Sequence, residues 1–124
     1  MHHRILLIED SPEGCQAVLE TLGEEDCRVA TVANCDGMLE NIEKWPQEYD
    51  AVIIEEAIQG GKGMNLLHAV RVRTRHMPVV MVTRDGNWQG CARALAEGAV
   101  KYLQFPLNPV ELRSVIHRVL ASPA

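Results

Sequence analysis

Two acidic pairs stand directly after apolar segments of strand length. Glu9 and Asp10 follow RILLI. Glu55 and Glu56 follow AVII within the segment YDAVIIEEAIQGGKG. Clustered carboxylates repel one another and persist where they are solvated, partly protonated or neutralised by a cation. Oxygen ligands without histidine or cysteine suit Mg²⁺, which uses one or two protein carboxylates. We therefore predict one shared acidic crevice. The simpler alternative is that these acids are exposed to solvent at the strand ends, and it applies most readily to Glu56.

Apolar periodicity predicts five strand–helix units that would position these acids. The strands are expected at five apolar stretches: Arg4–Glu9, about Arg28–Val32, Ala51–Glu55, Val79–Thr83 and Lys101–Gln104. The helices are expected between and after them: from Ser11 to near Gly23, from Asp36 to Trp45–Pro46, after Gly63, over about Trp88–Glu97, and from Asn108 onward. Ser11 and Asn108 each precede a proline, which is typical of a helix N-cap. In the first helix we expect Ala17 or Val18, Leu19 and Leu22 to face the core.

Strands and helices alternating at these lengths predict an α/β fold with a parallel sheet and helices on both faces. At this size we expect the flavodoxin-like (βα)5 arrangement, a doubly wound five-stranded sheet of order 2-1-3-4-5. Residues 1–124 would then form a single domain. Ligands in such sheets bind beyond the carboxyl ends of the strands where the order reverses, between the first and third strands. The acidic pairs fall at that reversal.

The composition limits the classes of function. The chain has 124 residues, a formal net charge of −5 and no apolar run longer than a strand. We therefore expect no membrane span and no nucleic-acid binding by the chain itself. Its four cysteines show no C-x-x-C pair, which favours reduced thiols in a cytoplasmic protein. We expect no signal peptide and no enzymatic activity, since no Ser-His-Asp or Cys-His constellation is present.

Four segments in order carry a resemblance to a known family: the acidic pair after the first strand, YDAVIIEEAIQGGKG, PVVMVT and GAVKYLQFPLNPVEL. Together, and over essentially the whole chain, they resemble the receiver domain of bacterial two-component response regulators. The resemblance places Glu55 at the phosphoacceptor position, and Thr83 and Tyr102 at the switch positions. It places Pro106 after a cis peptide bond. It also implies a metal position formed by Glu9, Asp10, Glu55 and the backbone of Ala57, at which Mg²⁺ would bind weakly or not at all.

The departures from the family pattern bear on function. The family has an aspartate where Glu55 stands and a lysine where Phe105 stands. Glutamate is one methylene longer, and a misplacement of 1 Å can cost on the order of 10²-fold in rate. The missing lysine would have stabilised the transferring phosphoryl group. Phosphoryl transfer is thus disfavoured by two separate changes.

Two cations are candidates to balance the acidic crevice. Arg84 stands where the family has a small residue, and we expect it to turn toward Glu55 or Asp10; the alternative is that it points into water. Lys62 lies in the loop after the third strand and is the second candidate. In the loop, Gln59 and Lys62 replace the proline and aspartate of the family.

The resemblance predicts a receiver domain in two-component phosphorelay signalling, acting by protein–protein interaction without conventional aspartyl phosphorylation. It would bind a histidine kinase, an output protein or a second copy through the fourth helix, fifth strand and last helix. Trp88 is either an exposed anchor there or a cover for the sheet edge. One alternative is a receiver switched by Mg²⁺-dependent phosphorylation at Glu55. A flavodoxin-like nucleotide or flavin binder is disfavoured, because no G-x-G-x-x-G or P-loop follows the first strand.

Overall fold

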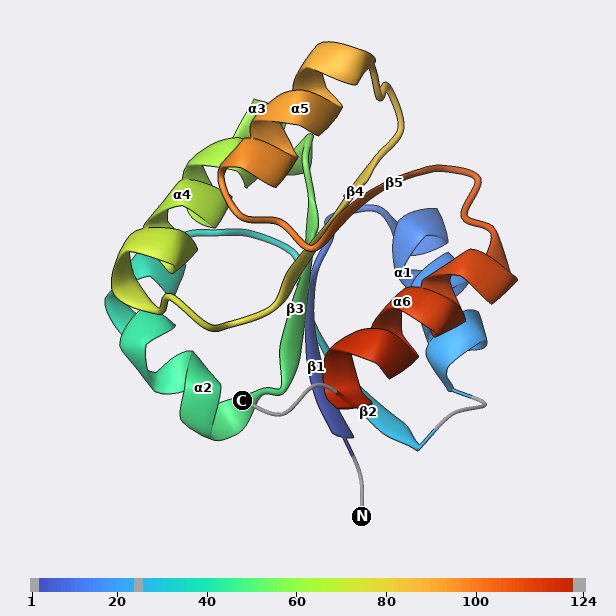
Figure 1. The fold of residues 1–124 in the computed structure, drawn as a ribbon, viewed down its shortest axis with the longest axis horizontal. Helices are drawn as coiled ribbons and strands as arrows, with labels where there is room; N and C mark the ends of the chain where they lie inside the picture. Colours follow the sequence, from blue (N-terminus) through green and yellow to red (C-terminus); the bar gives the residue numbers. More distant parts are fainter. Residues whose placement is uncertain (1–2, 24–25, 122–124) are drawn as a thin grey trace.

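The computed structural model describes residues 3–23 and 26–121, which form a five-stranded sheet between two layers of helices (Figure 1). The strands are β1 to β5 in chain order: His3–Ile8, Cys27–Val32, Ala51–Glu55, Val79–Thr83 and Lys101–Gln104. The helices are α1 to α6 with one 3-10 helix, η1, before α2: Pro12–Leu22, Met38–Lys44 (η1), Trp45–Glu48, Ile58–Gly61, Gly63–Arg73, Trp88–Ala96 and Pro109–Ala121.

The sheet has the strand order β2-β1-β3-β4-β5, and every neighbouring pair is parallel. This confirms the predicted doubly wound α/β fold. The strands β3 and β4 are buried at every position, as expected where helices cover both faces of a parallel sheet. In the register of β1 and β3, Ile8 lies opposite Ile54. The residues that follow, Glu9 and Glu55, therefore leave the sheet side by side at its carboxyl edge.

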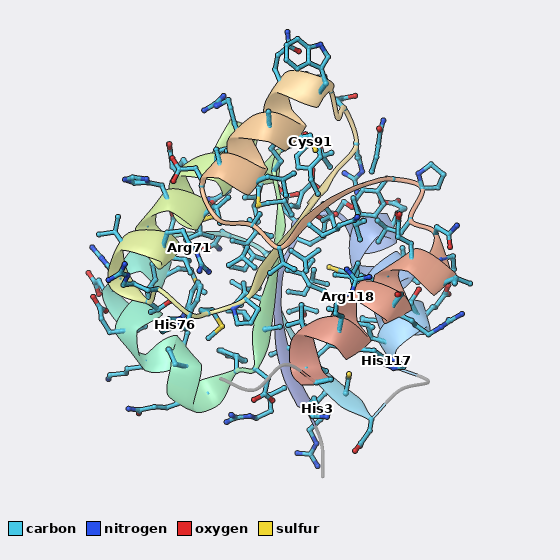
Figure 2. All side chains as sticks on the ribbon, in the orientation of Figure 1. His3, Arg71, His76, Cys91, His117 and Arg118 are labelled. Atoms are coloured by element: carbon cyan, nitrogen blue, oxygen red, sulfur yellow. The ribbon has the colours of Figure 1, made fainter. Side chains whose placement is uncertain are left out.

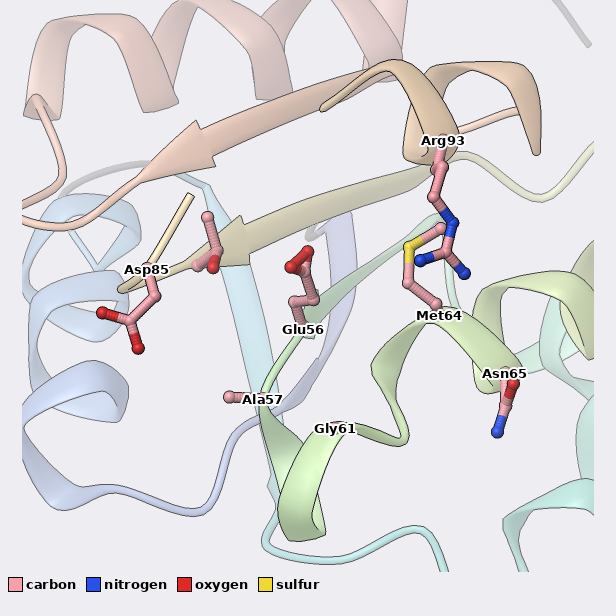
Figure 3. A pocket seen from close by; sticks show the side chains of 8 residues that line it. Glu56, Ala57, Gly61, Met64, Asn65, Asp85 and Arg93 are labelled. Carbon is pink, nitrogen blue, oxygen red and sulfur yellow. The ribbon is translucent and has the colours of Figure 1, made fainter. Parts of the chain in front are cut away.

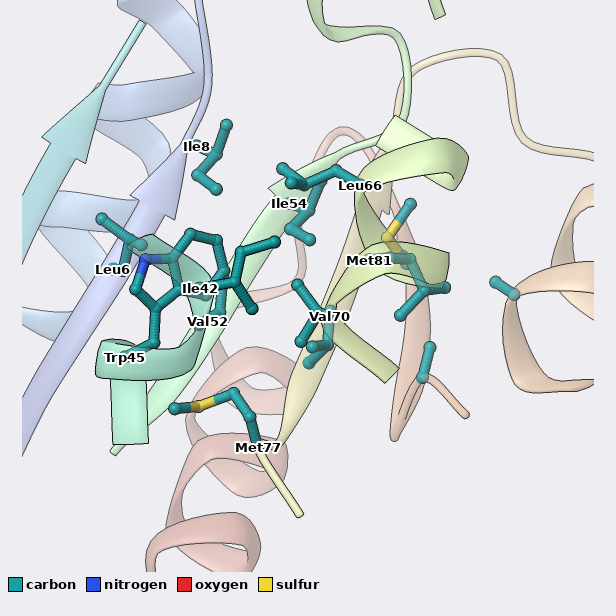
Figure 4. Packing of buried hydrophobic residues seen from close by; sticks show 14 of the residues in the cluster. Leu6, Ile8, Ile42, Trp45, Val52, Ile54, Leu66, Val70, Met77 and Met81 are labelled. Carbon is teal, nitrogen blue, oxygen red and sulfur yellow. The ribbon is translucent and has the colours of Figure 1, made fainter. Parts of the chain in front are cut away.

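Each face of the sheet carries its own apolar core. Helices α1 and α6 cover one face, and α2 to α5 cover the other (Figure 1). The core under α2 to α5 includes Trp45, Ile54 and Val70 (Figure 4). The core under α1 and α6 includes Val18 and Ile116. Apolar burial of this kind contributes roughly 25 cal/mol per Å², and it fixes the strands whose ends form the acidic crevice.

Both predicted helix caps are present. The Ser11 hydroxyl accepts the Gly14 N–H at 2.9 Å. The Asn108 amide oxygen accepts the N–H groups of Val110 and Glu111 at 2.9 and 3.2 Å. Each cap satisfies donors that a helix N-terminus otherwise leaves unpaired.

The structure differs from the sequence-based expectations in three elements. The segment expected as one helix from Asp36 is η1 followed by α2, and Pro46 lies in the first turn of α2 instead of ending the helix. Proline is tolerated in a first turn because its missing N–H would be unpaired there. A short turn, α3, precedes α4. Leu19 is exposed, because the buried stripe of α1 runs through Gly14, Val18 and Leu22. Within the described residues, no helix is long and apolar enough to span a bilayer.

Candidate functional site

Glu9 and Glu55 are buried acids on adjacent strands. Their exposed fractions are 2% and 1%, and β1 and β3 are hydrogen-bonded neighbours. Asp10 follows Glu9 but is exposed, and its carboxylate accepts the Gln59 N–H at 3.2 Å. The structure therefore brings together three of the four acids expected at the carboxyl edge.

The Glu55 carboxylate has little to stabilise its charge. One oxygen, Oε1, accepts the Ala57 N–H at 3.2 Å. The other, Oε2, is buried and has no hydrogen-bond partner among the described residues. Burial raises the pKa of Glu55 from 4.5 to about 7, and the charge of Glu9 acts in the same direction. A buried carboxyl without a full set of donors holds its proton more tightly than an exposed one.

Arg84 supplies the positive charge of the crevice, but to a different acid from those expected. Its Nη2 donates to Glu9 Oε1 at 2.9 Å, forming an ion pair, and it also contacts the Ser11 hydroxyl. Its guanidinium carbon lies 5.1 Å from the centre of the Phe105 ring, within the range of a cation–π interaction. The expectation that Arg84 turns toward Glu55 or Asp10 is thus corrected: Glu9 is the partner, because Ser11 and Phe105 hold the guanidinium there.

Gly14 provides the space for this ion pair. An ideal Cβ on Gly14 would overlap Glu9 Oε1 and would lie 2.9 Å from Arg84 Nη2. Alanine inside a helix is ordinarily more favourable than glycine by about 1 kcal/mol. At this position the added methyl group must instead displace a buried carboxylate. The role of Gly14 gives no signal in the sequence, since it depends on where α1 passes the end of β1.

The Gly14→Ala variant is therefore expected to lower the free energy of unfolding by about 1–3 kcal/mol, the usual cost of overpacking. Urea denaturation followed by circular dichroism measures the change. In a Glu9→Ala background the methyl group has room, so the same substitution is expected to have little effect. A Gly14→Ala protein as stable as wild type would show that the carboxylate moves aside freely.

Lys62, the second candidate counter-charge, is exposed at the start of α4. The ion pair with a buried acid is made by Arg84. Gln59, in the same loop, has a positive φ of 48°. Its side-chain oxygen accepts the Cys35 N–H at 2.5 Å, while its own N–H binds Asp10. The loop after β3 is thus tied to the acidic edge by Gln59.

Glu56, expected in the acidic pocket, accepts a hydrogen bond from Tyr102. The Tyr102 hydroxyl lies 2.8 Å from Glu56 Oε2 and 3.1 Å from Oε1. Burial raises the pKa of Tyr102, and the hydrogen bond to Glu56 adds to this. An ideal Cβ on Gly90 would lie 2.7 Å from the Tyr102 hydroxyl, so this glycine leaves room for the ring to turn inward. The hydrogen bonds between Glu56 and Tyr102 thus link the end of β3 to β5.

A second hollow of about 320 Å³ lies beside the acidic crevice, between the β3 end and α5 (Figure 3). It is lined by residues of β4 and of the segments around α3, α4 and α5: Glu56, Ala57, Gly61, Met64, Asn65, Thr83, Asp85 and Arg93. Glu9 and Asp10 do not line it. Thr83 is buried at the end of β4. The peptide bond between Phe105 and Pro106 is cis, as the resemblance implies.

A comparison with protein families shows which family the chain belongs to. The model of the response regulator receiver domain matches residues 5–117. The chain belongs to the response regulator receiver family. The resemblance in the four sequence segments is thereby confirmed, and with it a place in two-component signalling.

Curated relatives contain this receiver domain as one part of a longer chain. The two-component response regulator PhoP of Pseudomonas aeruginosa is 26% identical over 117 residues, which cover 94% of this chain and 51% of the relative. The phosphate regulon transcriptional regulatory protein PhoB of Escherichia coli is 28% identical over 123 residues, which cover 97% and 52%. The chain spans about half the length of these relatives.

Solved receiver domains share the fold. A response regulator receiver domain protein from Clostridium thermocellum superposes with a TM-score of 0.84 at 25% identity, covering 95% of this chain and 94% of that one. The receiver domain of the sensor histidine kinase PA1611 from Pseudomonas aeruginosa has a TM-score of 0.82 at 24% identity, covering 98% and 100%. In that structure a magnesium ion is coordinated in the active site cleft.

The metal position implied for this receiver domain does not fit Mg²⁺ in the observed arrangement. Glu9 Oε1 is held by Arg84 and Ser11. The Ala57 carbonyl, expected as a backbone ligand, accepts the N–H groups of Gly60 and Gly61 at 3.1 and 3.2 Å. Across residues 3–23 and 26–121, no group of three or more His, Cys, Asp or Glu side chains is arranged to hold a metal ion.

Within the part of the chain that the structure describes, histidine and cysteine do not replace these ligands. Those labelled in Figure 2 lie on separate parts of this receiver domain: His3 on β1, His76 before β4, Cys91 on α5 and His117 on α6. The oxygen ligands at the carboxyl edge are therefore the relevant set, and two of them, Glu9 Oε1 and the Ala57 carbonyl, are already engaged by groups of the protein.

Proposed function

We propose that this receiver domain signals through protein–protein contacts and works without conventional aspartyl phosphorylation. It is a single domain that is not itself an enzyme, and it acts in the cytoplasm. In this proposal Mg²⁺ binds weakly at most, and nucleic acid is not bound by the domain itself.

The burial of Glu55 carries this proposal. A phosphoacceptor must present an oxygen to the donor for in-line attack. Glu55 is 1% exposed, and its Oε2 is closed off from solvent. Near neutral pH much of it is protonated, because burial raises its pKa to about 7, and a protonated carboxyl is a poor nucleophile. The longer side chain that replaces aspartate thus ends inside the protein.

The surroundings of Glu55 also lack the cation that phosphoryl transfer requires. Catalysis of this reaction is largely positioning and neutralisation of charge on the transferring group. Phe105 stands where the family has a lysine, and it offers neither charge nor a hydrogen-bond donor. Arg84 is committed to Glu9 and Ser11, so its charge is not free to bind a phosphoryl group.

The face formed by α5, β5 and α6 is the proposed contact surface. Trp88 is 76% exposed, so it does not serve as a cover for the sheet edge. Leu95, near the end of α5, and Val100, directly before β5, are also exposed. Large apolar side chains exposed on one face are a feature of protein contact surfaces. The partner is a histidine kinase, an output protein or a second copy of the chain.

Mass spectrometry tests the proposal. The intact protein is incubated with acetyl phosphate and Mg²⁺, and its mass is expected to stay unchanged. A receiver domain that has aspartate at the acceptor position and lysine before the proline serves as the positive control for the reagent. A mass gain of one phosphoryl group that hydroxylamine removes would support the competing function, a receiver switched by phosphorylation at Glu55.

A further inference from the structure

The acidic crevice contains a cation that the chain itself supplies. Arg84 follows β4, and Glu9 follows β1, with β3 between these strands in the sheet. The Arg84 side chain therefore crosses the carboxyl end of β3, where Glu55 stands, before it reaches Glu9 at 2.9 Å. Its positive charge lies over the two buried acids and not at the margin of the crevice.

Three groups hold the guanidinium in this place: the Glu9 carboxylate, the Ser11 hydroxyl and the Phe105 ring. The Ser11 hydroxyl donates to Glu9 Oε1 at 2.7 Å, accepts the Gly14 N–H at 2.9 Å and contacts Arg84 Nη2. The Phe105 ring supplies an aromatic face 5.1 Å away. Because Ser11 is also the N-cap of α1, the position of the ion pair is coupled to the start of that helix.

Arg84 and Phe105 are complementary replacements. A lysine at position 105 would set a second positive charge against the guanidinium, and like charges at such distances repel. A phenyl ring instead presents the negative face of its quadrupole to the guanidinium. The loss of the lysine and the gain of the arginine are therefore parts of one rearrangement of charge.

We propose that the Arg84 guanidinium takes the place of a divalent ion, so that the wild-type crevice excludes Mg²⁺ and loss of Arg84 opens a metal site at Glu9, Asp10 and Glu55. Two buried oxygens, Glu9 Oε2 and Glu55 Oε2, have no hydrogen-bond partner among the described residues. Once the guanidinium is gone, these two oxygens are available as the hard ligands that Mg²⁺ and Mn²⁺ prefer. Glu9 Oε1 then keeps only the Ser11 hydroxyl as a partner.

This inference deepens the proposed function, because a receiver crevice closed to metal also lacks the ion used in phosphoryl transfer. The two can fail separately. Phosphorylation of the wild-type chain would overturn the proposed function. Equal metal affinity with and without Arg84 would overturn the inference. The proposed function would survive that result, provided that acetyl phosphate leaves the mass of the wild-type chain unchanged.

Metal titration of the 124-residue chain tests the inference. Mn²⁺ binding is measured by isothermal titration calorimetry, and the melting temperature is measured with and without MgCl₂. Wild type is expected to show no shift. Arg84→Ala and Arg84→Gln are expected to bind Mn²⁺ at least about tenfold more tightly than wild type, a change of about 1.4 kcal/mol, and to melt at a higher temperature with Mg²⁺.

Two control proteins separate a metal site from a general change in charge. Arg75→Ala also removes one positive charge, but Arg75 is exposed before β4, at the opposite edge of the sheet; it is expected to behave as wild type. Adding Glu9→Gln to Arg84→Ala is expected to abolish the gain. The inference is overturned if wild type binds Mn²⁺ as tightly as either Arg84 variant, a comparison that needs only one of the two variants to fold.

Discussion

Replacing Arg84 with alanine is expected to lower the free energy of unfolding at neutral pH by about 2–3 kcal/mol. The change leaves the Glu9 carboxylate buried without a cation, and breaking a buried pair by removing one partner costs about 3–5 kcal/mol. The Arg84 side chain is 40% exposed while that of Glu9 is 1% exposed, so solvent screening reduces the effect. Urea denaturation in the presence of EDTA measures it without interference from metal.

A double-mutant cycle with Glu9→Gln shows whether the effect belongs to the ion pair. The neutral glutamine keeps the size of the side chain and has no charge to leave unpaired. Arg84→Ala in this background is therefore expected to cost much less than in wild type, with a coupling of about 2 kcal/mol between the two positions. A coupling near zero would show that Arg84 stabilises the protein only through its packing on Phe105.

Replacing Glu55 with glutamine is expected to raise the free energy of unfolding by about 3 kcal/mol at about pH 8, and to change it little at about pH 5. The pKa of Glu55 is about 7 in the folded protein against an ordinary value of 4.5. The folded state therefore binds more protons than the unfolded state between these values, and wild-type stability falls as the pH rises through this window. The magnitude follows from about 1.4 kcal/mol per pKa unit.

Denaturation curves at several pH values, again in EDTA, measure the Glu55 effect. The fall in wild-type stability is expected between about pH 4.5 and 7, with a plateau above. Glu40→Gln, at an exposed position of η1, removes one negative charge without burial and is expected to keep the wild-type pH dependence. A Glu55→Gln protein with the same pH dependence as wild type would contradict the raised pKa.

The sequence predicted the fold well because its signals are local. Apolar runs of strand length and the caps Ser11 and Asn108 are each encoded within a few residues, and the sheet order follows from alternation and size. The segment from Asp36 was harder to predict. Its helical pattern is weak, and it forms a 3-10 helix that ends next to Trp45, whose side chain packs into the core. There tertiary packing overrides a helical pattern that is weak on its own.

The site was only partly predictable, because its contacts depend on where side chains meet in space. The convergence of Glu9 and Glu55 follows from topology. The choice of Glu9 as the partner of Arg84 depends on the space at Gly14, which no motif encodes. In the same way, Glu55 and Glu56 are neighbours in the sequence but make different contacts. Glu55 accepts the Ala57 N–H, whereas Glu56 accepts the Tyr102 hydroxyl.

The unequal burial of the two tryptophans makes the α5 region optically distinct from the rest of the molecule. Trp45 is 2% exposed inside the core, whereas Trp88 is 76% exposed at the start of α5. An aqueous quencher of indole fluorescence reaches Trp88 and not Trp45. Binding of a partner at the α5 surface can therefore be followed by the tryptophan fluorescence of Trp88, with Trp45 as an internal reference and no dye attached.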